Sequence, residues 1–533
     1  MPTDVEIAQA ADLKPIGEVA EGLGLGPDEI EPYGAFKAKV RLEALDRRAN
    51  GENGRLILVT AMTPTPLGEG KTLTTVGLGQ ALSRMGRRSV ICVREPSLGP
   101  VFGVKGGATG GGLSQVLPME DINLHFTGDL HAVTSAHNLL SAMLDAHIFH
   151  GNALNIDVNQ ITWKRVLDVN DRALRNVIVG LGGKAHGIPR QDGFMITAAS
   201  EVMAALCLAS SLPDLKKRVK RIVVGYSRKG APVTAGDLEA AGAMALLLRD
   251  ALKPNLVQSL EHTPALVHGG PFGNIAHGTN SVIADRLALK LGEVVITEAG
   301  FGSELGAEKF FDITARAAGF TVHAVVLVAT VRALKLHGGV PFDLERLARE
   351  DVEALDRGLA NLVAHVENLR NFGVPLVVAV NRFGSDTDAE VKRVRERCAE
   401  LDVPCGVHEF FAHGGGGNLE VAEMALDRAQ SSQTPQTPLY PLELPLDKKI
   451  ETVAKTLYGA DGVAFEPGAG RSLKKLTELG YGNLPVCIAK TQASLSDDPK
   501  RLGAPKGFTL RVRDAYVCAG AGFVVAIAGN IMQ

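Results

Sequence analysis

Short runs of aliphatic and β-branched residues recur along the chain, and stretches with the spacing of amphipathic helices separate them. Continuous apolar runs are typical of strands covered on both faces, as in a parallel sheet. The clearest runs cover residues 55–61, 89–93, 221–225, 293–297, 324–329 and 375–380. Two apolar helix faces end at glycines, one comprising Leu78, Ala81, Leu82 and Met85 before Gly86, and the other Leu362, Val366 and Leu369 before Gly373. This alternation predicts an α/β fold built on a doubly wound, mostly parallel sheet, with additional smaller α/β domains.

Proline and the apolar pattern together predict the domain organisation. The segment 431–447 contains Pro435, Pro438, Pro441 and Pro445, a composition typical of a linker or surface crossover. We therefore expect a body over residues 1–430 with an insertion at roughly 110–290, a proline-rich linker over 431–447, and a C-terminal α/β region over 448–533. The uncharged stretch 515–533 is interrupted by glycines and lacks leucine, which favours buried strands over a membrane span.

Composition and charge exclude several classes of protein. Of the 533 residues, 45% are hydrophobic and 22% charged, which suits large cores and excludes a mostly disordered chain. The 56 Lys and Arg against 59 Asp and Glu give a net charge of −3, without the basic excess typical of nucleic-acid binding. The six cysteines form no CxxC pair, and the N-terminus lacks an apolar leader. We expect reduced thiols in a cytoplasmic protein that binds neither nucleic acid nor membrane.

Several of the 60 glycines lie in one chemically distinctive loop, and this loop gives the first indication of a function. Thr63–Thr72 follows the first apolar run directly and precedes a helical stretch, the context of a phosphate-binding loop. Backbone N–H groups of such a loop surround phosphate, Lys71 reaches the β- and γ-phosphates, and the Thr72 hydroxyl binds the nucleotide's Mg²⁺. The strict pattern has glycine at the position of Thr65. The predicted nucleotide-binding residues are Thr65, Pro66, Leu67, Gly68, Glu69, Gly70, Lys71 and Thr72.

Other glycine clusters follow the later apolar runs. Arg94 comes directly after the run 89–93, at the edge where open α/β sheets bind ligands, and can hold a phosphate or form an ordinary ion pair. Gly103–Gly112, which includes Lys105, is either a binding loop or a flexible linker. His-Gly-Gly sequences begin at His268, His337 and His413. Turn glycines explain these three better than a zinc site, because no metal-binding spacing is present.

Longer segments resemble one family, formate–tetrahydrofolate ligase (10-formyltetrahydrofolate synthetase). The resemblance extends over nearly the whole chain. It is carried by Thr63–Thr72, Arg94–Gly112, Glu120–His131, Glu261–Ser281, Thr297–Glu308, Val328–Gly339 and Leu484–Gln492. The Gly-Val-Lys-Gly-Gly-Ala and Val-Ala-Thr-Val-Arg-Ala-Leu-Lys stretches are close to family signatures, and the family accepts threonine at the Thr65 position.

The resemblance implies a reaction in which formate, ATP and tetrahydrofolate give 10-formyltetrahydrofolate, ADP and phosphate through formyl phosphate. Positioning and charge neutralisation dominate such phosphoryl transfers. We assign Lys71 and Arg94 to the transferred phosphoryl group, Thr72 to Mg²⁺, and Lys105 to phosphate or formate. Asp129 is a further candidate in this pocket. Glu95 is a candidate general base for the folate amine, with His131 as an alternative and structural hydrogen bonding as another interpretation.

Folate binding requires a flat slot with aromatic partners. The family pattern points to Phe383 and Phe411, and we add Phe301. Family members usually carry Trp at the Phe411 position, Lys at the His413 position and Asp at the Met195 position, and they continue beyond the position of Gln533. The resemblance also implies a homotetramer and allows for a monovalent cation.

Two alternatives remain open at this point. The first is a nucleotide-binding homologue with weakened or lost synthetase activity, suggested by the altered stacking position and the early end of the chain. The second is a P-loop switch or partitioning ATPase, which requires a switch loop and a basic partner-binding face. Neither feature is evident in the sequence.

Overall fold

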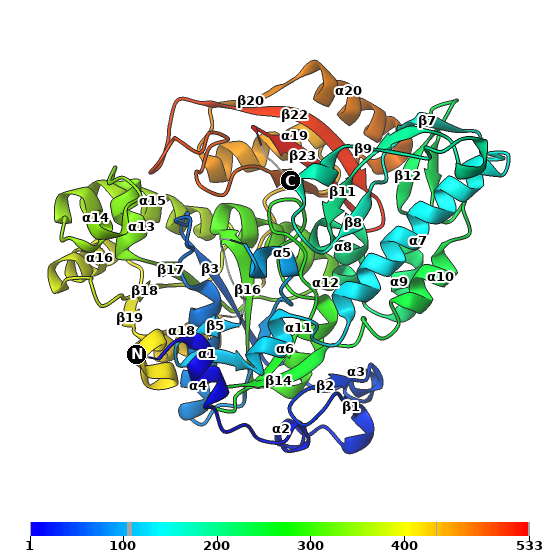
Figure 1. The fold of residues 1–533 in the computed structure, drawn as a ribbon. Coiled ribbons are helices and arrows are strands. Elements are labelled where there is room, and N and C mark those ends of the chain that lie inside the picture. Colours follow the sequence, from blue (N-terminus) through cyan, green and yellow to red (C-terminus); the bar gives the residue numbers. More distant parts are fainter. Residues whose placement is uncertain (1, 104–108, 433, 531–533) are drawn as a thin grey trace.

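The computed structural model describes residues 2–103, 109–432 and 434–530, and it is built around one large, mixed sheet (Figure 1). The strand order of this sheet is β1-β2-β14-β15-β4-β16-β3-β17-β18-β19, and β6 pairs with both β14 and β5. The strands are β1 (Ile30–Pro32), β2 (Ala38–Val40), β3 (Arg55–Ala61), β4 (Ser89–Val93), β5 (Gly110–Gly111), β6 (Ser114–Leu117), β14 (Asn255–Ser259), β15 (Pro264–Val267), β16 (Val294–Gly302), β17 (Ala324–Ala329), β18 (Leu376–Asn381) and β19 (Cys405–His408).

The strands from β15 to β19 in this order are parallel, whereas β1, β2, β6 and β14 pair antiparallel. β3 lies centrally, and Ile57 pairs with Ile296 of β16 and Ala324 of β17. Predicted strands at 55–61, 89–93, 293–297, 324–329 and 375–380 all lie in this parallel part. Their buried residues on both sheet faces confirm the predicted α/β fold.

Helices cover both faces of the parallel strands. Leu56 and Leu58 of β3 face a core formed with α11 (Val282–Leu291) and α15 (Val352–Arg370). Ile57 and Val59 face a second core formed with α4 (Lys71–Arg84) and α18 (Glu420–Ser431). Since successive strand residues point to opposite faces, the apolar run of β3 is explained by burial on both sides.

Shorter helices complete the outer layers and connections. They are α1 (Asp4–Gln9), α2 (Ile16–Gly22), α3 (Glu43–Arg47), α5 (Leu98–Val101), α6 (Met119–Asn123), α12 (Arg316–Ala318), α13 (Val331–His337), α14 (Leu344–Ala348), α16 (Asp388–Glu400) and α17 (Phe410–His413). Two π-helical segments, Ser303–Ala307 and Phe310–Ala315, follow β16.

The insertion has a core of its own. It contains α7 (Asp129–Phe149), α8 (Glu201–Leu208), α9 (Leu212–Lys220) and α10 (Ala241–Leu247). Its strands are β7 (Ile156–Ile161), β8 (Arg165–Leu167), β9 (Val177–Val179), β10 (Arg190–Asp192), β11 (Phe194–Ile196), β12 (Val223–Ser227) and β13 (Pro232–Thr234).

Two expectations for this region need correction. The run 221–225 was predicted as a strand of the parallel sheet, but β12 pairs antiparallel with β7 and β13 in a separate sheet. A short apolar run shows that a strand is buried and does not show which sheet it joins. Strands within 110–117 and 255–267 pair in the main sheet. The part with its own core is therefore narrower than the expected insertion at roughly 110–290.

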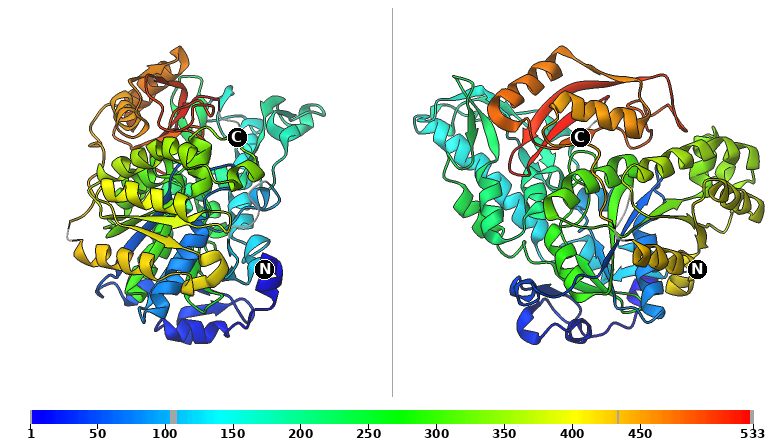
Figure 2. Two further views of the ribbon diagram at one scale, coloured as in Figure 1. Left: turned by 90° about the vertical axis from the view of Figure 1, so that its left-hand side faces the viewer. Right: turned by 180° about the vertical axis from the view of Figure 1, so that it is seen from behind.

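The C-terminal region packs directly on the body, above the main sheet in Figure 1 and in both views of Figure 2. It contains α19 (Leu446–Val453), α20 (Pro467–Leu476) and a sheet of β20 (Gly462–Phe465), β22 (Thr509–Cys518), β23 (Phe523–Ala528) and β21 (Val486–Ala489), in that order. Strands β22 and β23 confirm the predicted buried strands near the C-terminus. Their apolar side chains belong to the same core as Phe311 and Phe372 of the body.

The proline-rich segment is attached to the body rather than free. The Gln436 side chain accepts a hydrogen bond from Val322 N at 2.9 Å and donates one to Phe320 O at 2.6 Å. Leu439 N donates to Asp312 Oδ1 at 3.0 Å. Across the described ranges, no helix combines the length and apolar character needed to cross a membrane.

Candidate active site

The phosphate loop connects β3 to α4 at the carboxyl edge of the parallel strands. Gly68 and Gly70 have φ values of 81° and 75°, a region that glycine enters without the strain of a side chain. Thr65 N donates to Glu69 Oε1 at 2.6 Å and so closes the loop on itself. Thr65 does not adopt a positive φ, so glycine is not required at this position. Pro66 and Leu67 are exposed at the tip.

The segment that follows β17 and the end of β18 contact the phosphate loop from one side. Arg332, at the start of α13, donates from Nη2 to Gly68 O at 2.7 Å, and Thr330 donates to Glu69 Oε2. Asn381, the last residue of β18, donates from Nδ2 to Glu69 O at 3.1 Å. These contacts restrain the Gly68 and Glu69 carbonyl groups and the Glu69 carboxylate from one side of the loop.

A charged cluster lies on the other side, at the ends of β3, β4 and β16. Thr72 Oγ1 donates to Glu298 Oε2 at 2.8 Å, and Arg94 Nε lies 3.9 Å from Glu298 Oε1. Burial lowers the pKa of Lys71, while the Glu298 carboxylate opposes this shift and Arg94 adds to it. The sequence-predicted residues Thr72 and Arg94 therefore share one carboxylate, Glu298, which also influences the pKa of the neighbouring Lys71.

Glu298 was missed in the sequence analysis as a site residue. It lies inside the segment 297–308, but it follows an apolar run and has no distinctive spacing. The signal that could have identified Glu298 is its position as an acidic residue toward the carboxyl end of a central parallel strand. Ligand sites of such sheets lie at the carboxyl ends of their strands.

Arg94 is also contacted by the loop after β15 and by the last residues of β16. Its Nη1 donates to Pro271 O at 3.3 Å, and a Cβ added at Gly300 would lie 3.3 Å from Nη1 and Nη2. The Nε group is buried and finds no hydrogen-bond partner within the described part of the chain. The guanidinium is about one-quarter exposed, at 26%, so it retains donors for an anionic ligand.

Glu95 and Asp129 lie together on the opposite side of the end of β4. Burial, followed by the neighbouring Asp129 carboxylate, raises the pKa of Glu95 well above its usual range. Asp129 accepts hydrogen bonds from Lys39 Nζ at 2.7 Å and Asn255 Nδ2 at 2.8 Å. Both acidic side chains are buried, whereas the alternative base, His131, is exposed on α7.

The three predicted folate-stacking rings come from three different elements: the loop after β18, α17 and the end of β16. Phe383 is half-buried, and the Arg332 guanidinium carbon lies 4.0 Å from its ring centroid. Phe411 is 44% exposed on α17, and its carbonyl accepts from Leu113 N at the end of the glycine cluster. Phe301 has a φ of 61° and packs against Gly273 in the loop that contacts Arg94. Lys105 lies outside the described residues.

Two of the three His-Gly-Gly histidines have separate structural partners, whereas the His413 side chain is exposed. His268 bonds to Ser281 Oγ and Ala251 O, and His337 bonds to Thr63 O and Gly503 N. Within the described residues, no three His, Cys, Asp or Glu side chains are grouped so that they could hold a metal ion.

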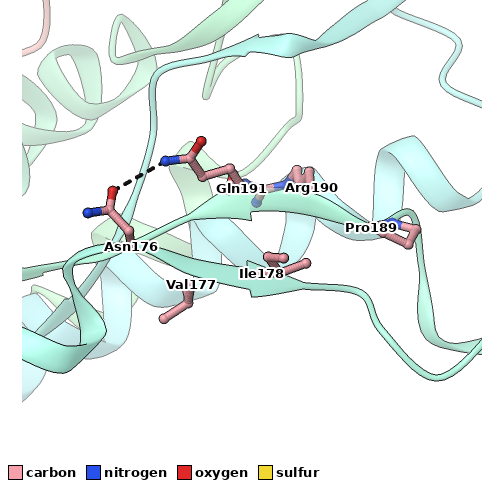
Figure 3. Close-up of a pocket in the computed structure, with 6 residues that line it drawn as sticks. All are labelled: Asn176, Val177, Ile178, Pro189, Arg190 and Gln191. Carbon is pink, nitrogen blue, oxygen red and sulfur yellow. Dashed lines mark hydrogen bonds between the residues drawn. The ribbon is translucent and has the colours of Figure 1, made fainter.

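A shallow hollow of about 560 Å³ lies in the insertion, beside the β9–β10 hairpin (Figure 3). Its lining residues are Asn176, Val177, Ile178, Pro189, Arg190 and Gln191, and Gln191 Nε2 donates to Asn176 Oδ1 at 3.2 Å. None of them is a predicted site residue.

Comparison with known families agrees with the geometry at the carboxyl edge. The family model for formate–tetrahydrofolate ligase matches residues 2–533. The match includes the phosphate loop, Arg94, Glu298 and the whole C-terminal region. The chain therefore belongs to the formate–tetrahydrofolate ligase family, an enzyme family that ligates formate to tetrahydrofolate.

Proposed function

We propose that this protein activates formate with ATP as formyl phosphate and transfers the formyl group to tetrahydrofolate. The products are 10-formyltetrahydrofolate, ADP and phosphate. The observation that carries the proposal is that Thr72 and Arg94 both approach Glu298, beside a phosphate loop that ends in Lys71.

In the first step, a formate oxygen attacks the γ-phosphorus and the bond to the bridging oxygen of ADP breaks. Lys71 and Arg94 place two positive charges where negative charge accumulates on the transferring phosphoryl oxygens. The loop N–H groups hold the remaining phosphates, so the nucleophile and the phosphorus are brought together without covalent help from the protein.

Thr72 has the chemistry to hold the Mg²⁺ that such transfers use. Its hydroxyl donates its proton to Glu298 at 2.8 Å, which leaves the oxygen lone pairs available to a cation. When bound, Mg²⁺ would neutralise part of the charge of the nucleotide phosphates. Glu298 would then orient the Thr72 ligand from behind.

In the second step, the folate amine attacks the formyl carbon, phosphate leaves, and the nitrogen loses a proton. We propose Glu95 and Asp129 as the residues that manage this proton, because they form a buried pair next to Arg94. Phe383, Phe411 and Phe301 are the proposed partners of the pterin ring, and Lys105 remains proposed for phosphate or formate. The competing interpretation is that Glu95 and Asp129 have a structural role and hold α7 against β4.

An ADP-release assay tests the reaction. We expect slow release with ATP alone and rapid release only with formate and tetrahydrofolate together. Turnover that ignores both co-substrates would contradict the ligase activity. Binding of ATP without turnover would favour a homologue with weakened or lost activity, the alternative suggested by Phe411 in place of the usual tryptophan.

The two cations of the cluster can be tested separately from folding. We expect Lys71→Ala and Arg94→Ala each to reduce kcat/KM by at least about a hundredfold, since each removes a charge that acts on the transferring phosphoryl group. Circular dichroism and the thermal midpoint should stay near those of the unchanged protein. A rate within threefold of normal for either variant would contradict its assigned role.

Family membership also supports a homotetramer and activation by a monovalent cation. Sedimentation at several protein concentrations tests the first proposal. Turnover compared in potassium and in a large organic cation at equal ionic strength tests the second.

A further inference from the structure

Arg332 makes contacts with two parts of the site that are far apart in sequence. Its Nη2 donates to Gly68 O of the phosphate loop at 2.7 Å. Its guanidinium carbon lies 4.0 Å from the centroid of the Phe383 ring. The side chain is 20% exposed, so both contacts are made with little competition from water.

The remaining contacts of this region make Arg332 a rigid connection. Glu69 Oε2 lies 4.0 Å from Arg332 Nε, which has no hydrogen-bond partner among the described residues. Phe383 N donates to Asp386 Oδ2 at 2.8 Å, which fixes the backbone beneath the ring. A shift of Gly68 therefore moves the guanidinium, and the guanidinium forms the surface on which the Phe383 ring rests.

The stacking also determines which side of Phe383 can bind a ligand. The guanidinium covers one ring face, so a flat heterocycle can stack only on the other. A planar guanidinium can donate along its edge while its face lies on an aromatic ring, a combination that a lysine ammonium cannot reproduce.

We propose that Arg332 is a positioning residue that couples nucleotide binding in the phosphate loop to pterin binding on Phe383. This inference rests on the proposed function, because it takes Phe383 as a folate-stacking ring. A nucleotide that orders Gly68 holds Arg332, and thereby Phe383, in the orientation that the pterin needs. By linkage, tetrahydrofolate increases nucleotide affinity by the same factor.

Equilibrium binding in the absence of formate measures this coupling, because no formyl transfer can take place. Calorimetry under anaerobic conditions gives the Kd of tetrahydrofolate with and without saturating MgADP, and the Kd of MgADP with and without saturating tetrahydrofolate. We expect each ligand to tighten the other by about fivefold or more in the unchanged protein.

Three variants separate the coupling from simple loss of a site. Arg332→Met keeps the length of the side chain and should reduce the coupling factor to near one, while both ligands still bind singly. Arg332→Lys should retain part of it, and Phe383→Leu should bring the factor to near one in both directions, because it removes the ring on which the guanidinium rests. The matched control is Arg501→Met, which removes an arginine that lies 5.9 Å from the Phe508 ring in the C-terminal region. Arg501→Met should keep the full coupling factor of the unchanged protein.

The outcomes distinguish this inference from the proposed function. Tetrahydrofolate that fails to bind the unchanged protein, with no formate-dependent ADP release, overturns both. Normal turnover with a coupling factor of one in the unchanged protein, or with an unaltered factor in Arg332→Met, overturns the role of Arg332 alone. If Arg332→Met does not fold, Arg332→Lys and Phe383→Leu decide the question by the same measurement.

Discussion

The C-terminal region and the insertion are both small sheets with helices, yet they relate to the body in different ways. The C-terminal strands share one continuous core with the body, whereas α7 to α10 pack mainly on one another. A shared core makes two regions fold as one unit, and a separate core allows partial independence. The proline-rich segment that precedes the C-terminal region therefore does not mark an independent domain.

The two regions also reach the active site at different places. The insertion contacts the segment after Arg94, where Asp168 accepts from Ser97 Oγ at 2.7 Å and from Leu98 N at 3.2 Å. The C-terminal region reaches the base of the phosphate loop through Gly503. The insertion thus borders the side where we place formate, and the C-terminal region supports the side where the nucleotide binds.

The connection from Gly503 to the phosphate loop is made of hydrogen bonds with fixed directions. Gly503 N donates to His337 Nδ1 at 3.1 Å, and His337 Nε2 donates to Thr63 O at 3.0 Å. Asn361 Nδ2 donates to Gly503 O at 2.7 Å and to Thr63 Oγ1 at 3.0 Å. Thr63 N donates to His365 Nε2 at 2.8 Å. Burial lowers the pKa of both histidines, so the neutral forms that these bonds require persist at neutral pH.

The largest expected effect comes from cavities placed in the two cores. Phe523→Ala in the shared core should reduce the free energy of unfolding by about 3–5 kcal/mol, and Leu140→Ala in the insertion by about 2–5 kcal/mol. Both side chains are fully buried. We expect Phe523→Ala to lower a single cooperative transition and Leu140→Ala to separate an early one, as followed by calorimetry.

Nucleotide binding just above the first transition of each variant serves as the control for that comparison. Leu140→Ala should still bind MgADP after its early transition, whereas Phe523→Ala should lose binding as it unfolds. One shared transition for Leu140→Ala would show that the separate core does not give independence.

An intermediate effect is expected from Asn361→Leu, which removes the three hydrogen bonds of this side chain with Gly503 O, Thr63 Oγ1 and Thr63 N. The buried partners left behind should cost about 1–3 kcal/mol of unfolding free energy. We also expect KM for ATP to rise more than KM for formate, because the change lies beneath the phosphate loop. Steady-state kinetics measure the split, and equal changes in both constants would indicate a general loss of structure.

We expect the smallest effect, a pH-dependent change in thermal stability, from a substitution at Glu201, where the insertion contacts the C-terminal region directly. Glu201 Oε1 accepts from Gly520 N at 2.6 Å, and burial raises the pKa of Glu201 to about 7. Because the folded pKa is raised, the stability contributed by its proton is complete below the unfolded pKa and is lost as pH rises through about 7. Glu201→Gln keeps the acceptor and removes the titration.

The thermal midpoint of Glu201→Gln, relative to that of the unchanged protein, should therefore increase between pH 5 and pH 8. Asp157→Asn on the exposed surface of the insertion is a control for ordinary carboxylate effects. A difference that stays constant over this range would contradict the assigned titration.

Much of the fold could be predicted because its signals are local. The apolar runs 55–61 and 324–329 are buried on both sides, and the loop after the first of them has glycines where positive φ is needed. The assignment of 221–225 to the wrong sheet shows the limit of such local signals. An apolar run indicates a buried strand but does not determine which strands it pairs with.

The candidate site residues that the sequence indicates lie in short motifs directly after apolar runs. Lys71 and Thr72 follow from the loop, but Glu298 is 226 residues from Thr72 in sequence. Asn361 and His365 are 298 and 302 residues from Thr63, on one face of a helix that reads as ordinary amphipathic sequence. Such contacts depend on the packing of α15 against the sheet, which the local pattern does not contain.

The position of β16 between β4 and β3 affects how the chain can fold while it is synthesised on the ribosome. β3 and its phosphate loop emerge early, but both neighbours of β3 come later, from residue 294 onward. Until then the newly made strand has two unpaired edges and no Glu298 beside its loop. Gly503, which supports Thr63 through His337 and Asn361, follows later still. A nascent chain therefore completes the surroundings of its phosphate loop only after residue 503 has emerged, and until β16 and β17 are made, both edges of β3 are open to the wrong partners.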